Sequence, residues 1–282
     1  MRAPSPGAMT PFLFVTVVFA ISVTAGLLGS LLGLGGGLIL VPVLTLLLKV
    51  DIRYAVGASI VSVIATSSGA AAAYVRDRLA NLRVAMFLEM ATTAGALTGA
   101  FLAGVVGGRG LYLVFGLVMG YSALAMLRKL GARADAPVPP DALADRLALH
   151  SSYFDEATGR EVDNRVTRPL TGLALMYAAG TVSGLLGIGS GALKVPAMDL
   201  AMRLPLKVST ATSNFMIGVT AAASAGVYFA RGDILLVMMA IPVARVALSL
   251  LIFRQQRDRA FVWVTSVVLT LLALSFLLGR AE

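Results

Sequence analysis

Long apolar runs, separated by short charged or glycine-rich segments, occupy most of this 282-residue chain. A helix needs about 20 apolar residues to cross the hydrocarbon core of a bilayer, where irregular backbone in contact with lipid is not tolerated. Runs near this length lie at 12–32, 54–74, 84–107, 111–127, 170–187, 208–230, 234–253 and 261–278. The sequence therefore predicts an all-α transmembrane protein with about eight full spans.

Two further apolar runs, 38–48 and 192–202, are too short to span a bilayer. Each follows a glycine cluster, Gly33-Leu34-Gly35-Gly36-Gly37 in one case and Gly187-Ile188-Gly189-Ser190-Gly191 in the other. Because glycine is unfavourable in a helix interior, such clusters interrupt helices. We therefore predict that both short runs are half-helices, each beginning at a break inside the membrane.

A shift of 154 residues aligns the second half of the chain with the first without a gap. Both halves contain the string Gly-x-Gly-x-Gly-x-x-x-Val-Pro, at 33–42 and at 187–196, which is hard to obtain by chance. Self-similarity at a fixed offset indicates an internal repeat. We therefore predict a first transmembrane repeat at 1–128, a linker at 129–169 and a second transmembrane repeat at 170–282.

Loop charges predict how the two repeats are oriented. Each repeat has about five helical segments, an odd number, so the repeats would enter the membrane in opposite directions. With the N-terminus outside, the inside loops hold fifteen Lys and Arg residues and the outside loops six, as expected of cytoplasmic loops. This favours two inverted-topology repeats with both termini outside and a cytoplasmic linker. In the parallel alternative, the cluster Arg76, Arg78 and Arg83 would lie outside.

The linker is the one sizeable polar region of the sequence. Pro137, Pro139 and Pro140 lie near its start, and 141–149 has the pattern of a short amphipathic helix. The following segment, 151–165, contains a Thr158-Gly159 turn typical of a small hairpin. We expect the linker to connect the repeats and to cap the inner face. A regulatory domain is the alternative.

Composition excludes several functional classes. With 58% hydrophobic and 13% charged residues, the chain suits lipid better than water, and its net charge of +9 comes from the ends of apolar runs rather than from a nucleic-acid-binding patch. There is no cysteine, and the single histidine, His150, lies in a polar loop. The glycine clusters fit neither a dinucleotide fingerprint nor a P-loop. We therefore expect no metal, no cofactor, no nucleic-acid partner and no enzymatic activity.

The glycine clusters predict where a ligand binds. A helix that begins after such a cluster presents unpaired N–H groups and the positive end of its dipole. Two such ends facing each other would form a positive pocket inside the membrane, which favours an anion. The predicted cradle consists of Gly35, Gly36, Gly37, Gly189, Ser190 and Gly191. The alternative is that these glycines only permit close helix packing.

Polar side chains follow each half-helix along the chain. Hydroxyl and amide groups suit the oxygens of sulfite, a sulfonate or a carboxylate, and the predicted ligands are Ser59, Thr212, Ser213 and Asn214. Charged residues within a membrane are costly and by default functional. Lys194 would supply a counter-charge to the anion or pair with Asp199. Glu89 would pair with Arg245 or carry a coupling proton.

These motifs resemble those of the sulfite exporter TauE/SafE family of membrane proteins. The resemblance rests on the glycine string ending in Val41-Pro42, on its counterpart at 184–196, and on the small polar stretch 209–214. It implies export or uptake of sulfite, sulfoacetate, related organosulfur anions or small carboxylates across the cytoplasmic membrane of a prokaryote. The second repeat departs from the family pattern, because Ser249 and Phe253 stand where the first has Gly95 and Gly99.

The leading hypothesis is a secondary transporter of a small anion, sulfite or an organosulfonate such as sulfoacetate, working by alternating access. A passive anion channel and a transporter of a small carboxylate are the close alternatives. A scaffold that binds partners through the linker is a third. Small residues between Ala91 and Gly104 would permit close helix contacts within one chain or in a homodimer. The expected location is the cytoplasmic membrane, crossed several times.

Overall fold

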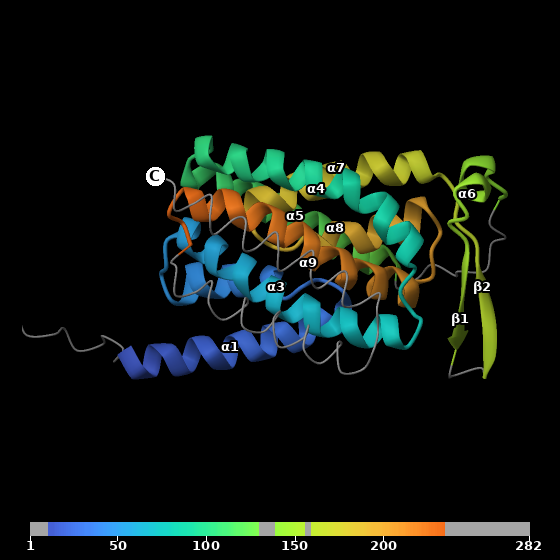
Figure 1. Ribbon diagram of the computed structural model, residues 1–282. Coiled ribbons are helices and arrows are strands. Elements are labelled where there is room, and N and C mark those ends of the chain that lie inside the picture. Colours follow the sequence, from blue (N-terminus) through green and yellow to red (C-terminus); the bar gives the residue numbers. More distant parts are fainter. Residues whose placement is uncertain (1–10, 130–138, 156–158, 235–282) are drawn as a thin grey trace, which may run out of the picture.

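Helices make up most of the computed structural model, which describes residues 11–129, 139–155 and 159–234 (Figure 1). The predicted spans at 234–253 and 261–278 lie outside the described residues apart from Ile234, and so does Arg245. The first half contains α1 (Pro11–Leu32), α2 (Gly37–Pro42), η1 (Val43–Leu47), α3 (Ile52–Arg76), α4 (Leu82–Val105) and α5 (Gly108–Lys129). After the linker come α7 (Pro169–Leu186), α8 (Gly191–Pro196), η2 (Ala197–Ala201) and α9 (Leu206–Ala230).

The predicted helical membrane architecture is confirmed in outline. Within the described ranges, α3, α4 and α7 are long and apolar enough to cross a membrane. Many large apolar side chains face outwards, and Phe101 and Leu117 are each 66% exposed. Exposed apolar surface of this kind suits contact with lipid rather than water. The chain is therefore a multi-pass helical membrane protein.

Both short helices change their winding at a proline. α2 ends at Pro42 and continues as the π-helix η1, and α8 ends at Pro196 and continues as the π-helix η2. Proline lacks the N–H that would bond to the carbonyl four residues earlier, so a wider turn follows it. These two segments coincide with the short runs at 38–48 and 192–202, and neither is long enough to span a bilayer.

Two long helices, α3 and α9, lie at the centre of the bundle and run antiparallel. Near the start of α3, Gly57 lies against the carbonyl group of Asp233, just beyond the end of α9. Beyond the other end of α3, the N–H of Asn81 donates to the hydroxyl of Thr212, near the start of α9, at 3.0 Å. Apolar side chains of both helices form much of the buried core between them.

A second helix pair, α4 and α7, packs through glycines and runs in parallel. Gly180 of α7 lies against the carbonyl of Thr92, and a Cβ atom at this glycine would collide with that backbone. The same holds for the other glycines of this contact, which are Gly95, Gly99 and Gly184. Small residues four apart allow such close approach of membrane helices. The small residues between Ala91 and Gly104 thus pack within one chain and give no separate support for a homodimer.

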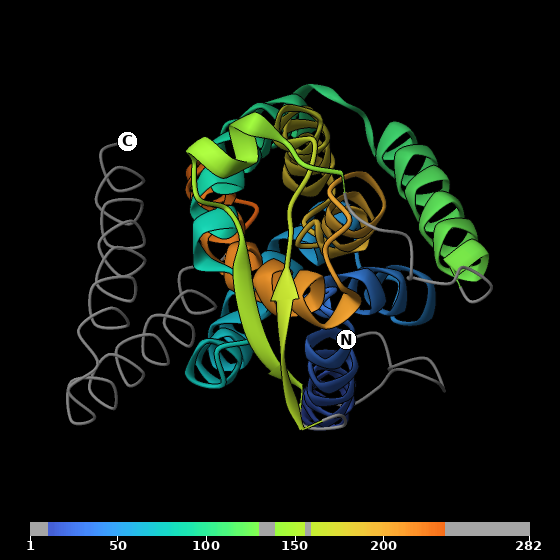
Figure 2. The same ribbon diagram turned by 90° about the vertical axis from the view of Figure 1, so that its right-hand side faces the viewer.

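The linker lies across one end of the bundle, the linker end (Figure 1, Figure 2). It contains α6 (Ala142–Arg146) and a hairpin of β1 (Ser151–Asp155) and β2 (Arg160–Asn164), which pair antiparallel. The turn between α3 and α4 is joined to it, because Asn81 donates its side-chain N–H groups to the Leu149 carbonyl at 2.8 Å and to Ser151 Oγ at 3.0 Å. The basic residues around this turn therefore lie at the linker end.

Candidate functional site

Two buried breaks lie at the centre of the bundle, the first break at 33–37 and the second break at 187–191. At each, the residue before the short helix has a left-handed conformation, with φ of 77° at Gly36 and 56° at Ser190. Within the described chain, no side chain caps the first turn of α2 or of α8. The N–H groups at both helix starts therefore lack the side-chain acceptor that usually binds them.

The two breaks touch each other through their backbones. A Cβ atom at Gly37 would lie 3.0 Å from the Cα of Ile188, and one at Gly191 would collide with the carbonyl of Gly33. Side chains larger than hydrogen are therefore excluded at Gly37 and Gly191. The sequence predicted that the ends of the two half-helices face each other, and the structure brings both segments together.

Two apolar side chains pack against both breaks. Val63 of α3 and Ile217 of α9 are fully buried and pack against both Gly35 and Gly189. A Cβ atom at either glycine would lie 2.9 to 3.3 Å from the nearest atoms of these two side chains. Both lie near the midpoint of their helices. The breaks thus meet near the midpoints of α3 and α9, around an apolar contact that Val63 and Ile217 form.

Serine hydroxyls cross-link the two halves at the breaks. Ser59 Oγ of α3 donates to the carbonyl of Gly187 at 2.8 Å, and Ser213 Oγ of α9 donates to the carbonyl of Gly33 at 3.0 Å. Both donors are fully buried. Each hydroxyl satisfies a carbonyl that the broken helix leaves without a partner. Ser59 and Ser213 therefore lie at the predicted cradle.

The other predicted polar ligands do not cross-link the two breaks. Asn214 donates its Nδ2 hydrogen to the carbonyl of Ser30 at 2.7 Å, while its buried Oδ1 has no partner among the described residues. Ser190 donates to the carbonyl of Gly189 at 2.8 Å. Thr212 lies apart from the breaks, because its hydroxyl accepts the N–H of Asn81 at the linker end.

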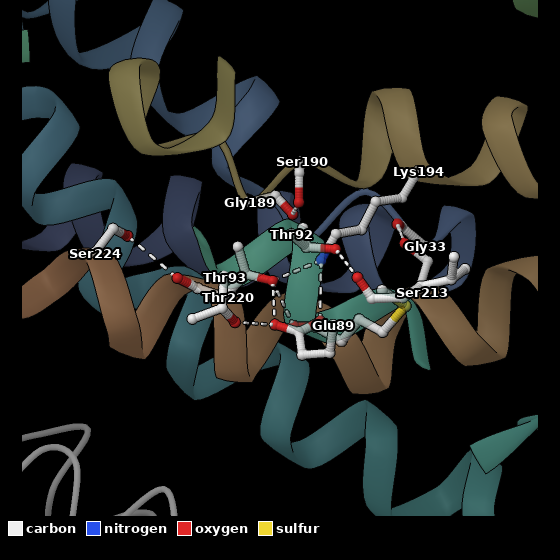
Figure 3. A network of polar contacts seen from close by, with 12 residues as sticks. Gly33, Glu89, Thr92, Thr93, Gly189, Ser190, Lys194, Ser213, Thr220 and Ser224 are labelled. Atoms are coloured by element: carbon white, nitrogen blue, oxygen red, sulfur yellow. Dashed lines mark hydrogen bonds and ion pairs between the residues drawn. The ribbon is translucent and has the colours of Figure 1, made fainter. Parts of the chain in front are cut away.

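The charged residue nearest the second break has a partner. Lys194 of α8 is fully buried, and its Nζ lies 3.7 Å from Glu89 Oε2 of α4 (Figure 3). Sequence reasoning offered Asp199 or the anion as the partner of Lys194, and the structure shows an ion pair with Glu89, which was not predicted. Arg245, which was predicted to pair with Glu89, lies outside the described residues.

Two threonines complete this network, and the contacts that they make with Glu89 and Lys194 were not predicted from the sequence. Thr220 of α9 accepts from Lys194 Nζ at 2.6 Å and donates to Glu89 Oε1 at 2.6 Å. Thr93 donates to the same Oε1 at 3.0 Å. Its position, four residues after Glu89 on one helix, could have indicated this contact. The contact of Thr220 could not be found from sequence spacing, because it joins distant helices.

Two tyrosines anchor the helices that precede the breaks. Tyr74 Oη donates to the carbonyl of Ser30 at 3.3 Å, and Tyr228 Oη donates to the carbonyl of Gly184 at 2.7 Å. The sequence showed these tyrosines only as a matching pair in the two halves. Their hydroxyls bind carbonyl groups in the last turns of α1 and α7, which lose their helical partners at the breaks.

Helices that break at mid-depth around a buried charge pair are typical of membrane transporters. Comparison with known proteins agrees with this class. The model of the sulfite exporter TauE/SafE family matches residues 18–276, so the chain belongs to this family of membrane transporters.

Three curated proteins are similar to the chain. It is 28% identical to the probable membrane transporter protein YunE of Bacillus subtilis (strain 168), over 71% of this chain and 73% of that protein. It is 29% identical to probable membrane transporter proteins from two strains of Xylella fastidiosa, 9a5c and Temecula1, over 69% of this chain and 67% of each. No solved structure matches the chain significantly.

Proposed function

We propose that this membrane transporter is a secondary transporter of a small anion, sulfite or an organosulfonate such as sulfoacetate, and that it works by alternating access. The observation that carries the proposal is the meeting of two uncapped helix starts, those of α2 and α8, at the centre of the bundle. Backbone N–H groups and helix dipoles at such ends attract negative charge. The family match supports the substrate class.

The proposed architecture is a pair of inverted-topology repeats at 1–128 and 170–282, with eight full spans and two half-helices. In support, the bounds of α2, η1, α3, α8, η2 and α9 differ between the halves by a constant 154 residues. The antiparallel course of α3 and α9 also agrees with inversion. A cytoplasmic linker at 129–169 is supported by its contact with the basic start of α4, where Arg83 Nη1 donates to the Ala148 carbonyl at 3.2 Å.

The proposed binding site lies between the first and second breaks. The oxygens of the anion would accept N–H groups at the starts of α2 and α8, and Ser59 and Ser213 would turn their hydroxyls from the break carbonyls to the ligand. Thr212 is left out of this site because its hydroxyl binds Asn81. In this proposal the contact of Val63 and Ile217 closes the site, and the two side chains would move apart to admit the anion.

The proposed inverted repeats favour a transporter over a passive channel, because interrupted helices at the interface of two such repeats form the substrate sites of secondary transporters. The described residues place backbone against backbone at the breaks, which suits a closed step of an alternating-access cycle. A small carboxylate presents the same oxygen chemistry as a sulfonate, so the test includes both.

Uptake of radiolabelled sulfite, sulfoacetate and short carboxylates into liposomes that contain the purified protein tests the proposal, with protein-free liposomes as the baseline. We expect saturable uptake of the sulfur anions. Ser213→Ala should raise the KM by about tenfold, since a hydrogen bond to a charged group is worth about 1.5 kcal/mol. Ser224→Ala is the matched control, because Ser224 donates to carbonyls of its own helix. A KM unchanged in Ser213→Ala would contradict the site.

A further inference from the structure

We propose that Glu89 is the site of proton uptake, and that proton and anion bind together because both act on Lys194. This inference rests on the proposed anion transport and adds its coupling ion. The structural basis is the network of Lys194, Glu89, Thr220 and Thr93, which joins α4, α8 and α9 (Figure 3).

The two oxygens of Glu89 differ in their surroundings. Oε1 accepts hydrogen bonds from Thr220 at 2.6 Å and from Thr93 at 3.0 Å. Oε2 is buried, accepts no hydrogen bond from the described residues, and lies 3.7 Å from Lys194 Nζ, beyond hydrogen-bond distance. A buried carboxylate oxygen without a donor is costly. Oε2 is therefore the atom with free capacity for a proton.

The same short helix carries the ammonium group and one of the proposed anion-binding ends. Lys194 lies three residues after Gly191, and its backbone N–H donates to the Ser190 carbonyl of the second break at 2.8 Å. Its charge is close to the proposed site, yet Glu89 balances it. While Glu89 is ionised, the pair is neutral and gives an incoming anion little net attraction.

The charge balance links the proton to the anion. An unpaired charge inside a membrane protein is strongly disfavoured. Two states of the network are neutral: ionised Glu89 with Lys194, and protonated Glu89 with Lys194 and one bound anionic group, such as the sulfonate of sulfoacetate, whose carboxylate would lie outside the network. A proton alone leaves one positive charge, and an anion alone leaves one negative charge. Binding of one therefore favours binding of the other, which couples one proton to each transported anion.

The hydroxyl of Thr220 can change its hydrogen-bond acceptor when Glu89 is protonated. Its single hydroxyl hydrogen has two acceptors within reach, Glu89 Oε1 at 2.6 Å and the carbonyl of Met216 at 2.9 Å. When Glu89 carries a proton, the hydroxyl can turn to Met216 while its oxygen still accepts from Lys194. Thr220 is therefore a positioning residue that holds the ammonium group in both states.

Other titratable groups on the packed elements lie elsewhere. On α7, Tyr177 has its hydroxyl within 3.3 Å of Thr98. On α9, Lys207 is in the first turn, and Tyr228 binds the Gly184 carbonyl. On η2, Asp199 lies five residues beyond Lys194. Among the described residues, Lys194 is the charged group that forms an ion pair with Glu89.

Proton-driven accumulation tests this coupling. Liposomes containing the purified protein receive radiolabelled sulfoacetate on both sides, with the membrane potential clamped at zero and a gradient of about one pH unit, acidic outside. With one proton per anion, a gradient of one pH unit should drive about tenfold accumulation inside. An internal pH dye should show acidification that follows sulfoacetate entry.

The variant Glu89→Gln imitates the protonated side chain. We expect it to exchange internal for external sulfoacetate but to lose the tenfold accumulation and the acidification. Asp233→Asn is the matched control, since it also removes a carboxylate from an ion pair, with Arg231, and the Asp233 side chain is 13% exposed against 11% for Glu89. This control should accumulate sulfoacetate like the unchanged protein.

The outcomes separate the two proposals. If the unchanged protein transports sulfoacetate without acidification or accumulation, proton coupling is wrong while anion transport stands. Accumulation retained by Glu89→Gln would also overturn the role of Glu89. If the unchanged protein moves none of the tested anions, the proposed function itself is wrong, and the coupling with it. The dye measurement on the unchanged protein decides on coupling even if Glu89→Gln does not fold.

Discussion

Ser59 and Ser213 occupy equivalent places in the two halves, and each donates its hydroxyl to the break of the opposite half, Ser59 to Gly187 and Ser213 to Gly33. The two bonds join α3 to the second break and α9 to the first break. A polar group that a break leaves inside the membrane is thereby satisfied within the protein. The same two hydroxyls lie at the anion site that we propose between the breaks.

Loss of either cross-link should weaken the fold. Ser59→Ala is expected to lower the free energy of unfolding by about 1 kcal/mol, because a hydrogen bond between membrane helices is worth about 0.6 to 1.7 kcal/mol. Thermal denaturation in detergent measures the change. Ser68→Ala is a suitable control, since Ser68 donates to the Ile64 carbonyl of its own helix. An equal loss in both variants would argue against a special role for the cross-link.

Close packing of α4 on α7 makes a second prediction. Gly184→Ala places a methyl group against the carbonyl of Ala96 and should destabilise the protein by about 1 to 3 kcal/mol. Gly116→Ala on α5 meets no described residue within 4 Å and should be neutral or stabilising, because alanine favours helix. Comparison of the two melting temperatures checks this. Equal melting temperatures would contradict the observed helix contact.

Docking of the linker depends on Asn81. Its side chain donates to Leu149 and Ser151 and accepts the N–H of Val84 at the start of α4. Asn81→Ala removes both the linker contacts and the helix cap, so the linker should be cut faster in limited proteolysis. Ser152→Ala, which changes an exposed contact with Glu161, should be cut at the rate of the unchanged protein. Unaltered cleavage of Asn81→Ala would show that other contacts hold the linker.

Acid should loosen the same linker through Asp141. Hydrogen bonds from the N–H groups of Ala144, Arg168 and Leu143 lower the pKa of its carboxyl below the ordinary value of 3.8. A lowered pKa stabilises the folded state above the unfolded pKa, and this contribution is lost as the pH falls through the folded pKa. The protection of α6 amides, that is, their exchange rate relative to the intrinsic rate at the same pH, should therefore fall below about pH 3.8. In Asp141→Asn this loss of protection with pH should be absent.

Much of the fold could be predicted from local chemistry. Glycine clusters mark both breaks because Gly36 and its neighbours adopt left-handed conformations that other residues adopt at a cost. The turn at Gly159, with φ of 63°, joins the strands of a hairpin at the place that the sequence indicated. Helix bounds also agree within three residues, because the charged, glycine and proline residues that bound the apolar runs lie near the helix ends.

The site was harder to predict because it depends on contacts between distant helices. Lys194 and Glu89 are brought together by the packing of α8 and α4, which no local spacing encodes. Thr212 illustrates a different reason. Adjacent helical residues point about 100° apart, so Ser213 faces the first break while Thr212 faces the turn at Asn81. Ser213 and Asn214 both donate to carbonyls at the end of α1, whereas Thr212 binds Asn81, so the three predicted ligands do not all face the first break.

Counterflow of sulfoacetate tests the central claim, alternating-access transport of a small anion, most directly. Liposomes containing the protein are loaded with unlabelled sulfoacetate and diluted into a trace of the radiolabelled compound. The account predicts a transient accumulation of label that saturates with concentration and is absent from protein-free liposomes. Flux of label that neither saturates nor responds to internal sulfoacetate would indicate a channel and contradict the account.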